Sequence, residues 1–372
     1  MKITIITSIH PDYDARIWKH CHSCKRLGYN VTLLCQWEGV PSGINTIDGV
    51  KVINYGSMGS RPFRLLKNNY KVFKAILLHN KSDIYHFHDI DILPVMTVLS
   101  FFKKVVYDIH ENYPEEMLEK FWLPRVLRRP LFYLVWFVQY FSIKVIKNIV
   151  LVAESQDEKI PKTNINKEYI YNYASKNVHN YNFLDKPKYS YDFIFTASQY
   201  KENGIELLID ALTIIKKLER RVTVLAVDRF KSEKYRSFIF KKIDDLGLHD
   251  YIIFFPNVLP HKLPEMLIKC RIGLVLDIPS KRRLMAIPTK IFEYYSAGLK
   301  VIASDLPNNR RFVNNEKLGF IFNANNPNLL AEKMLETTIQ SIDQLAIREI
   351  FENDYSWESQ DSLYKKLYKN AK

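Results

Sequence analysis

The sequence is poor in cysteine. It has four cysteines among 372 residues, and three of them lie within the first 35 positions. So few thiols in a chain of this length do not form the disulfide framework of small secreted domains, and a reducing cytoplasm is the expected location. The opening residues MKITIITS are also too short and too strand-like for a signal peptide.

Long hydrophobic runs are lacking as well. A membrane-spanning helix needs roughly 18 to 20 apolar residues, and the nearest segment, Leu131 to Ile146, is interrupted by Gln139, Ser142 and Lys144. Arginines precede this aromatic segment, so it could lie at a membrane interface, at the inner face of the cell membrane, or equally cover a sheet as an ordinary helix. Peripheral membrane contact is therefore an open expectation.

Several catalytic classes lack their motifs. The sequence contains no Gly-rich Walker loop, no paired CxxC motif and no nucleophile elbow. The run HCHSC at 20–24 could be a metal cluster, but it lies in a helical pattern without a second ligand pair, and a structural zinc site needs four converging ligands. We expect neither a metal nor another cofactor.

Basic residues are in excess. The formal net charge is +14, which favours an anionic partner such as a nucleotide, a lipid headgroup or a nucleic acid. No nucleic-acid-binding module is recognisable, so nucleic acid is not an expected partner. The hydrophobic fraction of 47% and the charged fraction of 25% are typical of a globular chain.

The length and the pattern of strands indicate two α/β domains. A chain of 372 residues is too long for one comfortable core. Short β-branched runs alternate with longer helical stretches, which is typical of parallel βαβ units and predicts a doubly wound sheet in each half. The expected strands are 3–7, 31–35, 50–55, 84–88, 105–110 and 149–153 in the first half, and 193–197, 222–227, 251–255, 272–277, 301–304 and 319–322 in the second.

The domain boundary is expected in the polar, Asn- and Lys-rich segment around 161–187. We predict an N-terminal Rossmann-like domain over 1–165, a linker over 166–188 and a C-terminal Rossmann-like domain over 189–354. The remaining residues, 355–372, have the pattern of a closing amphipathic helix.

Candidate chemistry lies in loops that follow strands, where open parallel sheets bind their ligands. In the fourth expected strand, alternation places His86 and His88 on one face and Tyr85 and Phe87 on the other. His88 and the following Asp89 come at the end of this strand. They are therefore the better candidates for a ligand site.

The fifth expected strand ends in a cluster of titratable groups. His110 lies near Asp108, Glu111 and Glu115. Carboxylates could hold this imidazole as a positioned donor to a sugar hydroxyl or a departing phosphate. An isolated histidine at a strand end is more often structural or merely exposed.

The first loop carries Asp12, Asp14 and Arg16. Asp14 could simply cap the helix that follows, with Arg16 pairing locally. Alternatively, these side chains face an acceptor or phosphates in a cleft. Both interpretations stay open.

The segment 287–305, IPTKIFEYYSAGLKVIASD, is the most informative part of the chain. It predicts a helix start, a stop at Gly298 and a buried strand. The unpaired N–H groups of a helix N-terminus, together with Lys290, suit a phosphate, and Glu293 could accept hydrogen bonds from ribose hydroxyls. The same residues also fit an ordinary capped surface helix.

This segment resembles the donor-site signature P-x-K-x-x-E-Y-x-x-x-G-x-x-V-I-A-S of bacterial family 4 retaining glycosyltransferases of the capsule, O-antigen and exopolysaccharide type. That family has the GT-B fold, in which two Rossmann-like domains face a cleft. The runs YDIHENYP at 107–114, HFHD at 86–89 and HPDYDARI at 10–17 resemble first-domain motifs of the same group. The likeness covers most of the chain and implies that the last helix crosses back to the first domain.

The resemblance implies a set of site residues. Lys290 and the helix N-terminus would stabilise the departing diphosphate, Glu293 would hold the ribose and His110 would orient the sugar, which makes these three the expected catalytic residues. The expected acceptor or cleft residues are Asp12, Asp14, Arg16, His88, Asp89 and Glu111. The expected nucleotide-sugar-binding residues are Ser198, Lys201, Asn203, Gly204, Asn257, Val258, Pro288, Thr289 and Tyr294.

The chain departs from the family pattern in the loop after the first strand of the second domain. Where the family has a frequent Arg and then a Lys or Arg, this sequence has Ser198 and Asn203. A charged hydrogen bond contributes roughly 1.5 to 3 kcal/mol, so losing two of them would weaken donor binding by about two to four orders of magnitude. Lys201, Arg229 or the basic run 281–283 could compensate. Met285 also replaces the first glutamate of the pair that is common in the wider family.

The expected function is transfer of a sugar, with retention and without metal, from a nucleotide-diphosphate donor to a surface polysaccharide or a lipid-linked saccharide. A UDP-sugar is favoured over a GDP-sugar. Two alternatives stay open. One is a GT-B protein with impaired donor binding that acts as a scaffold or regulatory partner, and the other is a nucleotide-sugar epimerase of the same architecture.

Overall fold

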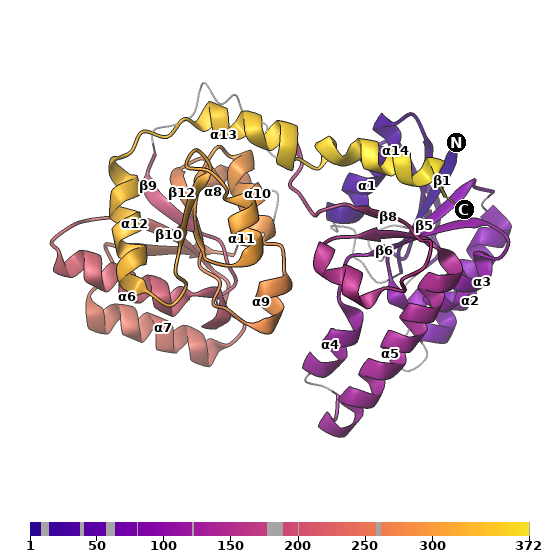
Figure 1. Ribbon diagram of the computed structural model, residues 1–372, viewed down its shortest axis with the longest axis horizontal. Coiled ribbons are helices and arrows are strands. Elements are labelled where there is room, and N and C mark those ends of the chain that lie inside the picture. The colour runs from indigo at the N-terminus through magenta and orange to yellow at the C-terminus, as the bar shows by residue number, and fades with distance from the viewer. Residues whose placement is uncertain are drawn as a thin grey trace. The chain divides into compact units, whose positions relative to one another are not determined.

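The computed structural model describes residues 1–8, 15–37, 41–56, 64–79, 81–120, 123–176, 189–199, 201–257 and 262–371. The chain forms two compact units (Figure 1). The first unit consists of Met1–Asn172 together with Gln360–Lys372, and the second consists of Tyr173–Ser359. Each unit is built on a sheet that is mostly or entirely parallel, as expected from the alternation of strands and helices.

The sheet of the first unit has eight strands in the order β3-β4-β2-β1-β5-β6-β7-β8. All neighbouring strands are parallel except β3 and β4, which form an antiparallel pair at one edge. The strands are β1 (Lys2–Ile6), β2 (Asn30–Cys35), β3 (Gly43–Ile47), β4 (Val50–Asn54), β5 (Ile84–Phe87), β6 (Lys104–Ile109), β7 (Asn148–Leu151) and β8 (Asn166–Tyr169).

Helices cover both faces of this sheet. The inner sides of α2, α3 and α5 share one hydrophobic core with Tyr85, Phe87 and Tyr107, whereas α1 and α14 cover the face toward which His86 and His88 point. The predicted alternation along β5 is therefore confirmed. The helices of this unit are α1 (Ala15–Arg26), α2 (Arg64–His79), α3 (Leu93–Leu99), α4 (Tyr113–Glu119), α5 (Arg125–Ile146) and α14 (Asp361–Lys369).

The sheet of the second unit is entirely parallel, with the order β11-β10-β9-β12-β13-β14. Its strands are β9 (Tyr191–Phe195), β10 (Val224–Asp228), β11 (Ile252–Pro256), β12 (Cys270–Val275), β13 (Lys300–Ser304) and β14 (Gly319–Phe322). Its helices are α6 (Ile205–Lys217), α7 (Glu233–Leu246), α8 (Leu263–Leu267), α9 (Lys281–Met285), α10 (Thr289–Ser296), α11 (Pro307–Phe312), α12 (Pro327–Ile339) and α13 (Gln344–Ile350).

Two strands were not expected from the sequence, and both lie at sheet edges. β3 is a short exposed strand that pairs only with β4. β8 falls inside the segment expected to be a linker, because its sequence NKEY is polar, yet it pairs in parallel with β7. Edge strands bury less apolar surface, so their hydrophobic signal is weak.

The chain returns to the first unit later than the expected start of a closing segment at 355. Trp357 is fully buried and its backbone N–H donates to the carbonyl of Ala174, so this residue belongs to the second unit. The return begins at Gln360, and α14 then buries Tyr364, Leu367 and Tyr368 in the first unit. Within the described residues, no helix combines the length and the apolar composition needed to cross a bilayer.

Candidate functional site

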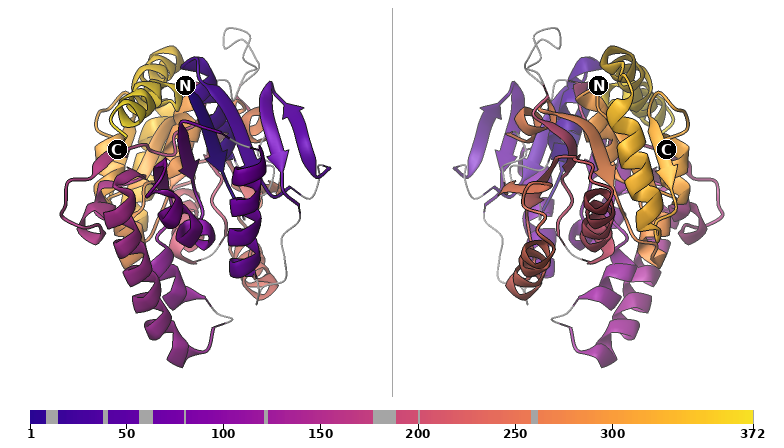
Figure 2. Two further views of the ribbon diagram at one scale, coloured as in Figure 1. Left: turned by 90° about the vertical axis from the view of Figure 1, so that its right-hand side faces the viewer. Right: turned by 90° about the vertical axis from the view of Figure 1, so that its left-hand side faces the viewer.

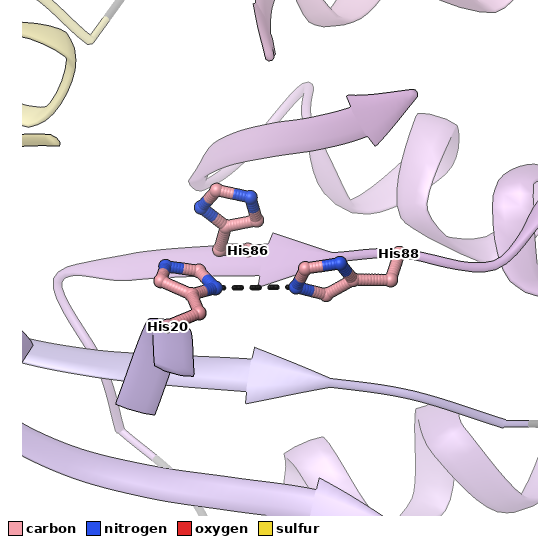
Figure 3. Close-up of side chains that lie close together, drawn as sticks. All are labelled: His20, His86 and His88. Atoms are coloured by element: carbon pink, nitrogen blue, oxygen red, sulfur yellow. Dashed lines mark hydrogen bonds between the residues drawn. The ribbon is translucent and has the colours of Figure 1, made fainter. Parts of the chain in front are cut away.

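The first unit contains a buried cluster of three histidines. His86 and His88 point from β5 toward His20 on α1, and all three side chains are fully buried (Figure 3). Nδ1 of His20 lies 3.2 Å from Nε2 of His88, which is a hydrogen bond whose donor depends on the tautomers. The cluster therefore joins the first helix to the central strand of its sheet.

The last helix completes this cluster. The hydroxyl of Tyr368 lies 2.6 Å from Nε2 of His20 and 2.9 Å from Nδ1 of His86. The ring of Tyr364 stacks on His20 at a centroid distance of 4.5 Å. Two segments far apart in the sequence thus meet through imidazole and phenol groups.

A buried ion pair lies beside the histidines. The guanidinium of Arg16 donates to both carboxylate oxygens of Asp108, with the shortest distance 2.9 Å, and also to the carbonyl of Ile170. Oδ2 of Asp108 lies 3.8 Å from Nε2 of His86 and 3.5 Å from Nδ1 of His88. Arg16 therefore pairs with a distant strand, rather than locally or with open solvent.

These contacts set the protonation states of the cluster. Burial alone would raise the pKa of Asp108, but Arg16 and the neighbouring histidines hold it well below its usual range. Burial is the main cause that lowers the pKa of His20 well below its ordinary value, and the neighbouring imidazoles lower it further. Burial is also the main cause that lowers the pKa of His88. The cluster thus contains a charged carboxylate and neutral imidazoles at pH 7.

The nitrogen atoms of His20, His86 and His88 lie close enough to converge on one metal ion. The network already hydrogen-bonds both ring nitrogens of His20, Nδ1 of His86 and Nε2 of His88. The adjacent Arg16 adds a positive charge, which opposes a cation. The arrangement therefore favours a structural network that fixes α1, β5 and α14.

The other expected cleft residues of the first unit differ in accessibility. Asp89 is fully buried and accepts hydrogen bonds from the hydroxyl of Thr7 at 2.8 Å and the backbone N–H of Ser8 at 2.6 Å. Nδ1 of His110 lies 3.9 Å from Oδ1 of Asp108, and the His110 side chain is 12% exposed. Glu111 is exposed. Asp12 and Asp14 lie outside the described residues.

Burial therefore changes the interpretation of three expected cleft residues. His88, Asp89 and Arg16 are all buried and hydrogen-bond inside the first unit. They position the chain around the strand ends. Among the described residues, His110 and Glu111 are the expected residues of this unit that reach its surface.

In the second unit, helix α10 presents the expected donor-site residues. Pro288 is its N-cap, no side chain caps its N-terminus, and Gly298 ends it in a left-handed conformation with φ of 69°. Lys290 and Glu293 are half-buried, and neither side chain pairs with another described residue. The helix thus offers unpaired N–H groups, a cation and a carboxylate to a ligand.

Tyr294 has a different place from the one expected. It is fully buried, and its ring fits against Gly273 of β12, where a Cβ atom would lie 2.2 Å from the ring. Its hydroxyl lies 2.9 Å from that of Thr196 and 3.3 Å from the carbonyl of Leu274. Tyr294 therefore anchors α10 to the sheet and does not face a ligand.

The loop after β9 turns sharply at Gly204. Its φ is 82°, and an added Cβ would lie 2.1 Å from the carbonyl oxygen of Leu276. Ser198 is half-buried, and Lys201 is exposed. Only glycine fits this approach of α6 to the end of β12.

Asn203 contacts an arginine from another element. Its side chain is 2% exposed and donates to the carbonyl of Ser198 at 2.6 Å. The guanidinium of Arg283, on α9, donates to the Asn203 oxygen and lies 3.4 Å from Oδ1 of Asp277. Arg283, from the basic run 281–283, therefore lies next to Asn203, where the family pattern has a lysine or an arginine.

The remaining expected residues are less constrained. Thr289 starts α10 and is half-buried, Asn257 is exposed just after β11, and Val258 lies outside the described residues. Arg229 donates to the carbonyl of Thr196 at 3.2 Å, so it supports the loop after β9.

Sequence reasoning did not identify several members of the first cluster. Asp108 was considered only as a neighbour of His110, and Tyr364 and Tyr368 only as part of an amphipathic pattern. Their meeting depends on contacts between residues as far apart as 20 and 368. The sequence signal that could have indicated this cluster was Asp108 near a strand end together with Arg16 early in the first helix.

Comparisons with known proteins complete this description. No curated protein matches the chain in sequence. Among solved structures, sucrose-phosphate synthase from Thermosynechococcus elongatus has 14% identity and a TM-score of 0.69, covering 99% of this chain and 98% of that one. A glycosyltransferase from Rickettsia africae has 17% identity and a TM-score of 0.68, covering 100% and 99%. Anabaena HepE in complex with UDP has 14% identity and a TM-score of 0.70, covering 98% and 99%.

The family comparison concerns the second unit. Residues 180–350 match the model of the family Glycosyl transferases group 1. This range contains α10, the loop after β9 and Arg283. The chain therefore has the GT-B fold, and the match to the Glycosyl transferases group 1 model covers most of its second unit.

Proposed function

We propose that the protein is a family 4 glycosyltransferase that transfers a sugar from a nucleotide-diphosphate donor. The observation that carries this proposal is the N-terminus of α10, where unpaired N–H groups, Lys290 and Glu293 lie together inside the matched family domain. A diphosphate leaving group develops negative charge, which a lysine and helix N–H groups stabilise. Glu293 would accept hydrogen bonds from the ribose.

Arg283 is the proposed substitute for the cation that Asn203 lacks. Its guanidinium is held by Asn203 and Asp277, and its Nε is buried without a hydrogen-bond partner. A guanidinium that retains donors suits bidentate binding of a phosphate. This arrangement supports donor competence against the alternative of a scaffold with an impaired donor site.

The donor is proposed to be a UDP-sugar, in line with the UDP that HepE binds. His110 would orient the donor sugar, and transfer would proceed with retention and without metal. The proposed acceptor is a surface polysaccharide, such as a capsule or O-antigen chain, or a lipid-linked saccharide. Glu111, Asp12 and Asp14 are the proposed acceptor-side residues, and a lipid-linked acceptor would place the protein at the inner face of the membrane.

Calorimetric titration with UDP tests the donor site. The wild type should bind UDP, and Lys290→Ala should weaken binding by roughly 10- to 100-fold, since a charged hydrogen bond contributes about 1.5 to 3 kcal/mol. Arg283→Gln should have a similar effect. Lys234→Ala, at an exposed position on α7, is the matched control and should bind as the wild type does.

Two outcomes separate the alternatives. If neither UDP nor GDP binds to the wild type, the scaffold function is favoured and the proposal fails. If incubation with a UDP-sugar alone yields its epimer, the protein is an epimerase, because a transferase requires an acceptor.

A further inference from the structure

The outer sides of α2, α3 and α5 expose an unusual set of apolar side chains. Leu66 is 72% exposed, Phe102 78%, and Phe137 61%. Further exposed aromatic side chains on the same elements and the turn after α3 are Tyr70, Phe101 and Phe141. We call these six residues the aromatic face.

The three elements lie on one side of the first unit. The inner sides of α2, α3 and α5 pack into the same hydrophobic core, and α3 contacts both of the other helices. On α5, the buried residues Gln139, Ser142, Ile143 and Ile146 follow a helical period, so Phe137 and Phe141 lie on the opposite side. Figure 2 shows α5 with α4 extending well beyond the sheet.

Exposed hydrophobic side chains elsewhere in the described structure are mostly isolated. In the second unit, Phe238, Ile253 and Ile339 come from separate elements. Scattered single residues of this kind are normal, whereas a contiguous apolar patch marks an interaction site. The aromatic face, in contrast, gathers exposed side chains from neighbouring elements of one unit.

The segments that carry this face have charges of one sign. The segments 64–79, 93–104 and 125–147 contain lysines and arginines but no aspartate or glutamate, although the chain has 40 acidic residues. Lys74, Lys103, Arg129 and Lys144 are exposed on these segments. Long basic side chains beside aromatic rings are the composition of a surface that lies in the headgroup region of an anionic bilayer.

We propose that the aromatic face docks the first unit onto an anionic lipid bilayer. Phe101, Phe102, Phe137 and Phe141 insert at the boundary between headgroups and acyl chains, and the lysines and arginines contact the anionic headgroups. A second copy of this chain is disfavoured as the occupant, because the same face of a partner would bring like charges together. The inference deepens the proposed membrane-side acceptor.

Co-sedimentation with lipid vesicles tests the proposal. One set of vesicles contains phosphatidylcholine alone, and the other also contains the anionic lipid phosphatidylglycerol at about 30%. The wild type should bind the anionic vesicles, and binding should weaken as salt is raised. The variant Phe137→Ser with Phe141→Ser should lose most of the binding. Its matched control is Phe238→Ser, which is 51% exposed on α7 of the second unit and should bind normally.

A charge variant tests the electrostatic part. Replacing Lys74, Arg129 and Lys144 with glutamine should weaken binding to anionic vesicles on the order of a hundredfold, since each basic residue near such a surface contributes about fivefold. The control replaces three exposed basic residues of the second unit, Lys217, Arg221 and Lys234, with glutamine, which changes the net charge equally.

Vesicle binding and UDP binding are measured on the same full-length proteins, so a failure of this inference is distinguishable from a failure of the donor site. Equal binding to neutral and anionic vesicles, or equal losses in both charge variants, would overturn the proposal. Self-association that disappears in the Phe137→Ser, Phe141→Ser variant, without binding to vesicles, would identify a second copy as the occupant and would also overturn it.

Discussion

Arg16 and Asp108 form a deeply buried ion pair, with side-chain exposures of 5% and 0%. Removing two charges from water is costly, so the pair stabilises the first unit only while both partners are present. The bidentate contact and the additional acceptor at Ile170 satisfy the guanidinium. The ion pair therefore fixes α1 against the end of β6.

Asp108→Asn should destabilise the first unit strongly. The substitution leaves the buried Arg16 without a counter-charge, and such losses cost about 3 to 5 kcal/mol. The midpoint of urea unfolding, followed by circular dichroism, measures the effect. Asp245→Asn is the control, because its partner Lys241 and Asp245 are 74% and 60% exposed and such pairs contribute less than about 1 kcal/mol. Similar midpoints for both variants would contradict this account.

The histidine cluster predicts a loss of stability in mild acid. Burial, first of all, lowers the pKa of His20 and His88 in the folded state. The unfolded chain therefore takes up protons near pH 6.5 more readily, so the contribution is complete above about pH 6.5 and is lost as pH falls. Below that pH, each of these histidines lowers the free energy of unfolding by up to about 1.4 kcal/mol per pH unit.

Melting temperatures between pH 7.5 and 5 measure this dependence. His20→Gln should make the curve shallower, because one proton-binding group is removed from the unfolded state. Lys234→Gln, at an exposed position on α7, is the control and should leave the slope as in the wild type, because it removes no histidine. A slope that His20→Gln does not change would exclude His20 as a source.

At the scale of the elements, a close approach between a ring and a glycine holds α10 against β12. Tyr294 lies against Gly273 of β12 and bonds to Thr196 at the end of β9. This contact sets the position of Lys290 and Glu293 on the same short helix. Donor binding at the proposed site should therefore depend on Gly273, which lies behind the ring of Tyr294.

Gly273→Ala should displace α10. The added methyl group would lie 2.2 Å from the Tyr294 ring, and overpacking of this kind costs typically about 1 to 3 kcal/mol. A lower melting temperature and weaker binding of UDP are the expected results. Unchanged values of both would show that the sheet and helix separate without penalty and would refute the proposed anchoring.

At the scale of the whole molecule, the two ends of the chain belong to one unit. Residues from Gln360 onward join Met1–Asn172, and α14 buries Tyr364, Leu367 and Tyr368 against it. The second unit is thus inserted, in sequence, before the last helix of the first. The first unit cannot be completed until the end of the chain is present.

Removing residues 361–372 should unfold much of the first unit. Fully burying a large apolar side chain contributes roughly 1.5 to 3 kcal/mol, and three are lost together in a domain that is stable by only about 5 to 15 kcal/mol. Limited proteolysis should cleave the first unit rapidly and spare the second. Lys365→Gln with Lys369→Gln is the control, because both side chains are exposed on α14. Protection of both units after truncation would contradict this expectation.

Local pattern in the sequence was sufficient for much of the architecture. The alternation of buried strands and helices predicted two parallel sheets, and the caps around 288–298 predicted the helix that carries Lys290. Periodicity and capping are short-range properties, so a single sequence displays them. The edge strands β3 and β8 were not predicted, because little apolar surface is buried there.

Tertiary structure alone decided which polar residues are buried together. His20, His86, Asp108 and Tyr368 come from four separate elements, and Asn203 meets Arg283 across 80 positions of sequence. Charge and polarity look the same in a sequence whether a side chain is solvated or enclosed. Only the packing of distant elements settles which of these groups lose water, and with it their protonation and their availability to a ligand.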